Sequence, residues 1–105
     1  MTTAAEVKIS KDGKCILVGG VLSFATVGVL RDQGNQLQEK LQTPVFDFKE
    51  VIRADSSALA LLTAWARYAR GSGKTADFIN IPPHLMDIAC LSRLDKVLSL
   101  RPSKE

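Results

Sequence analysis

Three consecutive residues with hydrogen-bonding side chains, Asp55, Ser56 and Ser57, stand where an apolar segment passes into an Ala- and Leu-rich one. If a helix begins here, one such side chain can accept a hydrogen bond from an unpaired first-turn amide, which stabilises the helix by ~1 kcal/mol. The same helix start carries partial positive charge, which favours a phosphate or an anionic group of a partner. The residues alone leave two interpretations open, helix capping and a contact site.

A second candidate is the run Gly71–Thr75, Gly-Ser-Gly-Lys-Thr, which resembles the end of a phosphate-binding loop. The full pattern requires a glycine at position 68, where this chain has Tyr68. It also requires a strand before the loop and a helix after it, whereas the expected order here is the reverse. We therefore expect a helix end and a solvated turn, not a nucleotide site.

The sequence offers no pairing of nucleophile and base. His84 is the only histidine and follows two prolines, which predicts an exposed place in the first turn of a helix. Asp47, Glu50 and Asp55 surround the end of a predicted strand, a spacing typical of solvated loop charges rather than of paired catalytic carboxylates. We expect a protein that is not an enzyme.

Metal and cofactor sites are likewise not expected. Cys15, Cys90 and His84 are spread along the chain and cannot supply a tetrahedral zinc site. In a reducing compartment both cysteines would stay thiols, most simply as small hydrophobic residues of the core.

Composition limits the class of protein. The 105 residues carry 14 Lys and Arg against 11 Asp and Glu, a net charge of +3, and 46% are hydrophobic. This describes one domain, 1–105, with loose ends at about 1–5 and 101–105. The longest apolar stretch, Ala58–Ala66, is far shorter than the ~20 residues that cross a bilayer. Residues 1–8 lack the features of a secretory signal, so we expect a cytoplasmic protein that neither inserts into a membrane nor binds nucleic acid.

The elements that must position these residues alternate along the chain. Hydrophobic periodicity, with Gly and Pro as breaks, predicts strands at 6–10, 15–22, 45–48 and 75–81, helices at 26–41, 56–70 and 82–92, and a further short strand at 97–100. We expect an α/β fold with a central mixed, mostly parallel sheet of four or five strands and about three helices, in the order ββαβαβα. Gly19 and Gly20 suggest a bulge or a close backbone approach, and Gly34 weakens its helix.

The predicted helix 56–70 is apolar on more than one face. Its apolar residues form one stripe of Leu59, Leu62, Ala66 and Ala69 and a second of Leu61, Trp65 and Tyr68. Either neighbouring helices bury the second stripe, or it is a partner surface with aromatic anchors.

Four short motifs, in order and spacing, resemble the STAS domain, the fold shared by anti-sigma-factor antagonists, sulfate-transporter tails and a subunit of lipid-transporting ABC systems. They are Leu22–Thr26, Asp47–Val51, Asp55–Leu59 and Leu91–Leu98, with Arg93 where the family usually has glycine. The resemblance spans nearly the whole chain. It implies a single STAS-like domain that acts as a protein-binding switch or scaffold.

The resemblance also implies residue roles. Ser57 matches the serine that a partner kinase phosphorylates in the antagonists. Ser56 matches a position where the lipid-transport branch usually has a residue with a hydroxyl group. Ser23 replaces a typical acidic residue of the antagonists and Ala58 replaces glycine. The Ala- and Leu-rich continuation looks more like the lipid-transport subunit, often called MlaB-like.

The leading expectation is a STAS subunit, without cofactor, that binds the cytoplasmic ATPase of a phospholipid-trafficking ABC transporter and so resides in the cytoplasm or at the inner membrane through that partner. The expected contact residues are Ser23, Phe24, Asp55, Ser56, Ser57, Ala58, Leu61 and Trp65. The alternative is an anti-sigma-factor antagonist, with an anti-sigma factor and a kinase as partners, switched by phosphorylation at Ser57, or less readily at Ser56. Lipid or nucleotide binding has no discrete site in the sequence.

Overall fold

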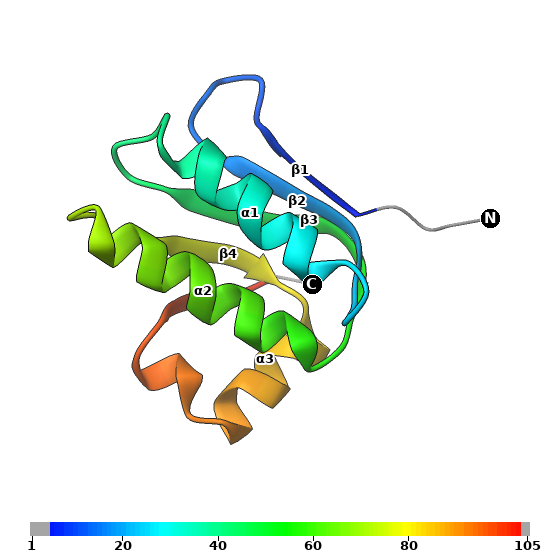
Figure 1. The fold of residues 1–105 in the computed structure, drawn as a ribbon. Helices are drawn as coiled ribbons and strands as arrows, with labels where there is room; N and C mark the ends of the chain where they lie inside the picture. Colours follow the sequence, from blue (N-terminus) through cyan, green and yellow to red (C-terminus); the bar gives the residue numbers. More distant parts are fainter. Residues whose placement is uncertain (1–4, 104–105) are drawn as a thin grey trace.

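A five-stranded sheet forms the centre of the computed structural model, which describes residues 5–103 (Figure 1). Its strands follow chain order across the sheet and are β1 (Glu6–Ile9), β2 (Ile16–Leu22), β3 (Val45–Ala54), β4 (Asp77–Ile81) and β5 (Ser99–Pro102). β1 pairs with β2 antiparallel, and the other neighbours are parallel. The prediction of a mixed, mostly parallel α/β fold is confirmed.

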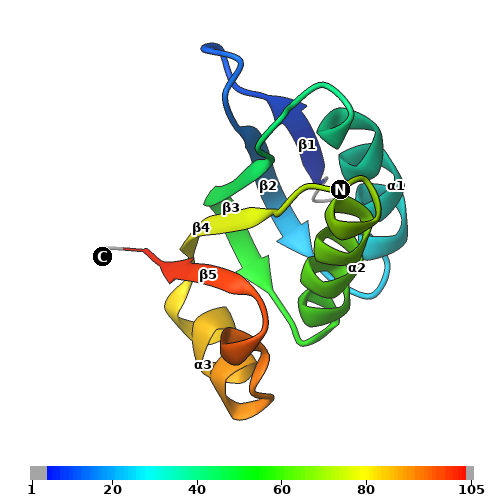
Figure 2. The same cartoon turned by 90° about the vertical axis from the view of Figure 1, so that its left-hand side faces the viewer.

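Three helices follow the strands. They are α1 (Val27–Gln38), α2 (Ser57–Gly71) and α3 (Pro83–Leu91), with a short 3-10 turn η1 (Leu94–Lys96) before β5. Helices α1 and α2 lie side by side over one face of the sheet, and α3 lies beyond them, toward β4 and β5 (Figures 1 and 2). The crossovers leave the carboxyl ends of β2 and β3 at one edge, next to the amino ends of α1 and α2.

The C-terminal strand differs from its prediction. It begins at Ser99 because η1 and the hydrogen bond from the amide of Leu98 to the carbonyl of Leu94 (2.8 Å) use the preceding residues. The element order is therefore ββαβαβαβ. Residues 101–102, expected to be loose, belong to β5; of the expected loose ends, 1–4 and 104–105 lie outside the described residues. Arg93, where the family usually has glycine, has the left-handed φ of 62° that glycine adopts easily.

The core is an aromatic cluster between the sheet and α2. Trp65 stacks on Phe46 with ring centroids 4.3 Å apart, and Phe46 stacks on Phe78 at 5.3 Å. Phe48 meets Trp65 edge-on at 6.4 Å. All four side chains are essentially buried. Since aromatic pairs add stabilisation beyond their buried area, this cluster fixes α2 on β3 and β4.

Gly34 has a packing role that the sequence did not suggest. A Cβ atom at this position would lie 2.3 Å from Nε1 and 2.5 Å from Cε2 of Trp65. The indole therefore occupies the space of the missing side chain, and its Nε1 donates to the carbonyl of Arg31 (3.2 Å). The lower helix propensity of glycine is offset by this close approach of α1 and α2.

The glycines of β2 accompany the predicted irregularity. The register between β2 and β3 shifts between Leu17 and Gly19 and again between Gly20 and Val21, with extra residues on β3. Gly20 has φ of 92°, and a Cβ on Gly19 would lie 3.3 Å from Cβ of Glu50. The expected irregularity of β2 is confirmed by these register shifts.

Candidate partner-binding site

The loops that follow β2 and β3 form one exposed tip, which we define as Ser23, Phe24, Asp55, Ser56 and Ser57. The amide of Asp55 donates to the carbonyl of Leu22 (3.1 Å), which ties the two loops together. Because β2 and β3 are parallel neighbours, their carboxyl ends bring together five of the eight predicted contact residues.

Asp55 organises the start of α2. Its Oδ1 accepts hydrogen bonds from the amide of Ser57 (2.8 Å) and from the Ser57 hydroxyl. The bond from the Ser57 hydroxyl, then that from its amide, holds the pKa of Asp55 below its ordinary value of 3.8. An exposed, ionised carboxylate therefore faces the Ser57 hydroxyl at neutral pH.

The capping interpretation applies to Asp55 and not to the serines. Ser56 occupies the N-cap position of α2, yet its side chain makes no capping hydrogen bond. Ser56 is exposed and Ser57 is half-buried. Asp55 therefore caps the start of α2, whereas the side chain of Ser56 stays exposed.

Phe24 is the most exposed large hydrophobic residue among those described, at 88% of its possible area. Its loop is held by Thr26, whose hydroxyl donates to the carbonyl of Val21 (2.9 Å) and accepts from the amide of Ser23 (2.9 Å). The ring is therefore presented by a fixed loop and not by a loose one. Exposed aromatic side chains on fixed backbone are typical of residues that anchor interfaces.

Three predicted contact residues are not on this surface. Ala58 and Trp65 are 0% exposed and Leu61 is 2% exposed, so the prediction that they contact a partner is wrong for the folded monomer. Trp65, on the second stripe, is covered by α1 at Gly34 and by Phe46 and Phe48 of β3. Tyr68, on the same stripe, is half-buried and its hydroxyl donates to Glu39 of α1. The alternative left open, burial by a neighbouring helix, is the correct one.

Sequence reasoning missed a shallow groove between the amino-terminal halves of α1 and α2. It is lined by Val27, Gly28, Arg31, Ala60, Leu61 and Ala64 and has a volume of about 90 Å³. The small residues at 60 and 64 lie one turn apart on α2, which is the signal that a pattern analysis could have used.

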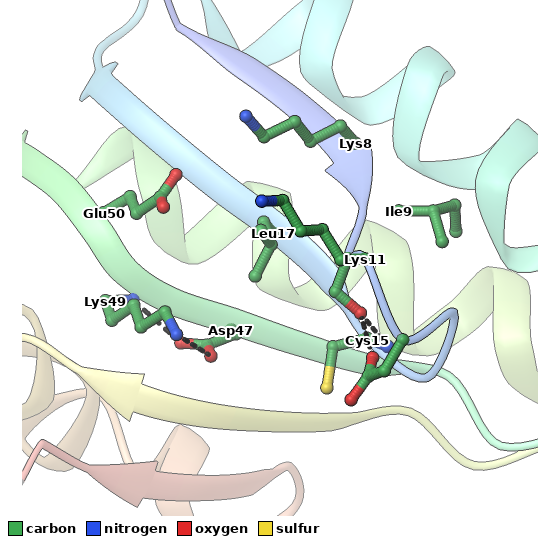
Figure 3. A pocket seen from close by; sticks show the side chains of 10 residues that line it. Lys8, Ile9, Lys11, Cys15, Leu17, Asp47, Lys49 and Glu50 are labelled. Carbon is green, nitrogen blue, oxygen red and sulfur yellow. Dashed lines mark hydrogen bonds and ion pairs between the residues drawn. The ribbon is translucent and has the colours of Figure 1, made fainter.

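A larger hollow of about 650 Å³ lies on the other face of the sheet, on β1, β2 and β3. Figure 3 shows Lys11 extending toward Leu17 and Lys8 extending from β1, with helices behind the sheet. Asp47, predicted to be a solvated loop charge, is 6% exposed. It accepts from the amide of Lys49 and from Nδ2 of Asn80, both at 2.9 Å. The bond from Asn80 links β4 to the Asp47 carboxylate on β3 and so helps to hold the two strands together.

The remaining candidates are dispersed. Glu50 is exposed on β3, as expected of a solvated charge, and His84 is exposed on α3. Cys90 is exposed and Cys15 half-buried, so the expectation of two core cysteines is wrong: Leu85 and Ala89 take the core face of α3. The pKa of the Cys15 thiol is raised above its ordinary value of 9.0, mainly by burial.

The glycine-rich run predicted to end a helix lies at the carboxyl end of α2. Gly71–Gly73 end α2, and the amide of Lys74 donates to the carbonyl of Ala69 (2.8 Å), which makes the glycine-rich run a helix end as predicted. Within residues 5–103, no group of three His, Cys, Asp or Glu side chains is placed to hold a metal ion. No helix in the described range has the length and apolar character to cross a membrane.

The same arrangement occurs in solved structures. An anti-sigma factor antagonist from Mycobacterium paratuberculosis matches 98% of this chain and 88% of its own, with a TM-score of 0.76 and 21% identity. The anti-sigma factor antagonist SpoIIAA in its unphosphorylated form matches with 96% and 90% coverage, a TM-score of 0.71 and 15% identity. The Bacillus cell fate determinant SpoIIAA in its phosphorylated form matches with 96% and 93% coverage, a TM-score of 0.66 and 16% identity. At these identities the likeness shows a shared fold.

The sequence itself matches a family model over residues 6–102, from β1 to the end of β5, and that model is described as Mlab, STAS domain. No curated protein matches the chain. The matched span includes both loops of the tip and every element of the sheet, so the chain belongs to the STAS domain family.

Proposed function

We propose that this chain is a non-catalytic STAS subunit that binds and supports the ATPase of a phospholipid-trafficking ABC transporter. The observation that carries the proposal is the match of residues 6–102 to the family model described as Mlab, STAS domain. STAS family proteins act by binding other proteins, and the exposed tip offers a surface for this. The predicted contact set, corrected for burial, is Ser23, Phe24, Asp55, Ser56 and Ser57.

The physical basis for binding is one aromatic anchor beside a small polar group. Phe24 would lose most of its exposed area in a partner's pocket, a gain of roughly 2 kcal/mol from area alone. Ser56 and Asp55 would add hydrogen bonds at the rim, which fix orientation more than affinity. Such a subunit supports its ATPase only by binding the active arrangement more tightly than the inactive one.

Co-purification with a matched pair of variants tests the proposal. The tagged chain is mixed with the ATPase subunit of the source organism's phospholipid-trafficking transporter, and binding is quantified by interferometry. Phe24→Ala is expected to weaken binding tenfold or more, because anchors of this kind dominate interfaces. Ile52→Ala is the control, since Ile52 is 75% exposed on β3 and outside the tip. Equal binding by both variants, or none by the unmodified chain, would contradict the proposal.

The alternative is an anti-sigma-factor antagonist regulated by phosphorylation at Ser57. It is favoured by the shared fold with anti-sigma factor antagonists and by the placement of the Ser57 hydroxyl against an ionised carboxylate. A phosphate on Ser57 would add close to two negative charges beside Asp55. The repulsion would break the Asp55–Ser57 hydrogen bonds and reshape the tip, which is a physical basis for a switch.

Intact mass spectrometry separates the two functions. The chain is incubated with ATP and the candidate partner kinases, with Ser57→Ala and Ser56→Ala as the paired variants. The antagonist function predicts one added phosphate that only Ser57→Ala prevents. Absence of the phosphate, together with ATPase binding, favours the transporter function.

A further inference from the structure

The carboxyl-terminal half of α2 and the segment from η1 to β5 form a groove that shares no lining residue with the tip. One part, of about 230 Å³, is lined by Thr63, Ala66, Arg67, Arg70, Leu94, Val97 and Leu98. The adjoining part, of about 120 Å³, is lined by Ala66, Arg70, Lys74, Thr75, Ala76, Val97, Leu98 and Ser99. Four residues, Ala66, Arg70, Val97 and Leu98, line both parts, so the two form one continuous groove beside α2.

The two parts differ in chemistry. The larger part is lined by four apolar residues, Ala66, Leu94, Val97 and Leu98, together with Arg67 and Arg70, and Val97 is 67% exposed. The Thr63 hydroxyl donates to the carbonyl of Leu59 (2.9 Å), so this residue has its polar group engaged within α2. This part of the groove is therefore suited to a short apolar chain.

The smaller part is polar and cationic. Arg70 lines it, and among the ion pairs of the described residues neither Arg70 nor Arg67 has a carboxylate partner. Lys74 lines it too, but its ammonium donates to the carbonyl of Gln38 (3.1 Å). Thr75 and Ser99 bring hydroxyls that make no side-chain hydrogen bond within residues 5–103. An unpaired guanidinium beside free hydroxyls is suited to a phosphate oxygen.

We propose that this groove binds a single-chain phosphate amphiphile, with the phosphate at Arg70, Thr75 and Ser99 and the apolar chain along Ala66, Leu94, Val97 and Leu98. The guanidinium supplies charge-assisted hydrogen bonds to the head group, and the apolar part removes the chain from water. Because the volume of the apolar part is small, it accommodates one short chain and not the two chains of a bilayer phospholipid. The site lies away from the tip, so it does not depend on which partner the tip binds.

Backbone amide chemical shifts of the labelled full chain test the site. Decyl phosphate below its micelle concentration is expected to give saturable shifts confined to residues 63–76 and 94–99. Inorganic phosphate is expected to bind at least tenfold more weakly, as judged from the shifts of the Arg70 and Ser99 amides. Decanol is expected to give no saturable shift. Inorganic phosphate binding as tightly as decyl phosphate would overturn the proposal, because the apolar part would then contribute nothing.

Paired variants locate the two ends. Arg70→Gln is expected to weaken decyl phosphate binding roughly tenfold, as the loss of a charge-assisted hydrogen bond implies. Val97→Asp is expected to weaken it at least as much by placing charge in the apolar part. Arg53→Gln, at an exposed position of β3, is the control of equal charge change and is expected to bind normally. Equal weakening in Arg70→Gln and Arg53→Gln, or shifts spread over the whole surface, would overturn the site.

Discussion

The two aromatic residues Phe24 and Trp65 differ in their surroundings, one on the loop before α1 and the other inside α2. Trp65 is wholly buried at the contact between α1 and α2, which we define by Trp65 and Gly34 and call the seam. The absent side chain of Gly34 makes room there for the indole. Phe24 is 88% exposed on a loop that two hydrogen bonds of Thr26 hold in place. One ring is packed in the core and the other is exposed, so an aromatic residue near a candidate site is not by itself evidence of an interface.

The largest expected effect comes from removing the seam's aromatic side chain. Trp65→Ala should reduce the free energy of unfolding by about 3–5 kcal/mol, because it leaves a cavity beside Phe46 and Phe48. Phe24→Ala should change it by less than about 0.5 kcal/mol, because the ring contacts mostly solvent. Urea unfolding followed by circular dichroism measures both. Similar stabilities of the two variants would abolish the distinction between seam and tip.

A pair of glycines in α1 sharpens the same distinction. Gly34→Ala should destabilise the chain by about 2 kcal/mol or more, because its Cβ would overlap the Trp65 indole. Gly28→Ala should leave stability unchanged or raise it by up to about 1 kcal/mol, since its Cβ would meet nothing within 4 Å. Thermal unfolding of both variants is the measurement. If Gly34→Ala were as stable as Gly28→Ala, the close contact of α1 with Trp65 would be wrong.

At the tip, charge should affect binding and spare the fold. Ser57→Asp is expected to weaken ATPase binding roughly tenfold by placing a second carboxylate beside Asp55. It should alter the free energy of unfolding by less than about 0.5 kcal/mol, because an acid is tolerated at a helix start. Ser57→Ala, which adds no charge, is the control. A Ser57→Asp variant that is unfolded in solution would contradict the placement of the tip at the surface.

The smallest effect concerns the ionisation of Asp55. The hydrogen bonds of Ser57 hold the pKa of Asp55 below 3.8, and the bond from the hydroxyl is the larger cause. Removing it in Ser57→Ala should bring the pKa back toward 3.8, measured by NMR titration of the carboxyl carbon. Because the folded-state pKa is the depressed one, the stabilisation is present above 3.8 and is lost as the pH falls through the folded value. An unchanged pKa in Ser57→Ala would show that the hydroxyl bond is absent.

Most of the fold was readable from local patterns. The alternation at β1, the apolar runs of β2 and β3 and the Ala- and Leu-rich α2 each carry a periodicity that neighbouring residues determine. The C-terminal strand was misplaced because the 3-10 turn at Leu94–Lys96 carries no apolar period of its own. Its start depends on how that turn packs, which is a tertiary property.

The site was predictable only in part, for the same reason. Asp55, Ser56 and Ser57 follow a strand directly, so strand order alone places them at the sheet edge. The burial of Leu61 and Trp65 depends instead on α1 crossing α2 near Gly34, a contact between residues 31 positions apart that helical periodicity cannot rank against a partner surface. Likewise, Asp47 is buried because Asn80 of a neighbouring strand donates to it.

The chain contains a single tryptophan, and its indole is wedged against the backbone of α1. The fluorescence emission of this residue therefore reports on the contact between the two helices, because no other tryptophan contributes to it. Docking at the Phe24 loop alone should leave that emission nearly unchanged, whereas any event that parts α1 from α2 should quench or red-shift it. The fluorescence of Trp65 therefore distinguishes binding at the surface from a rearrangement of the two helices.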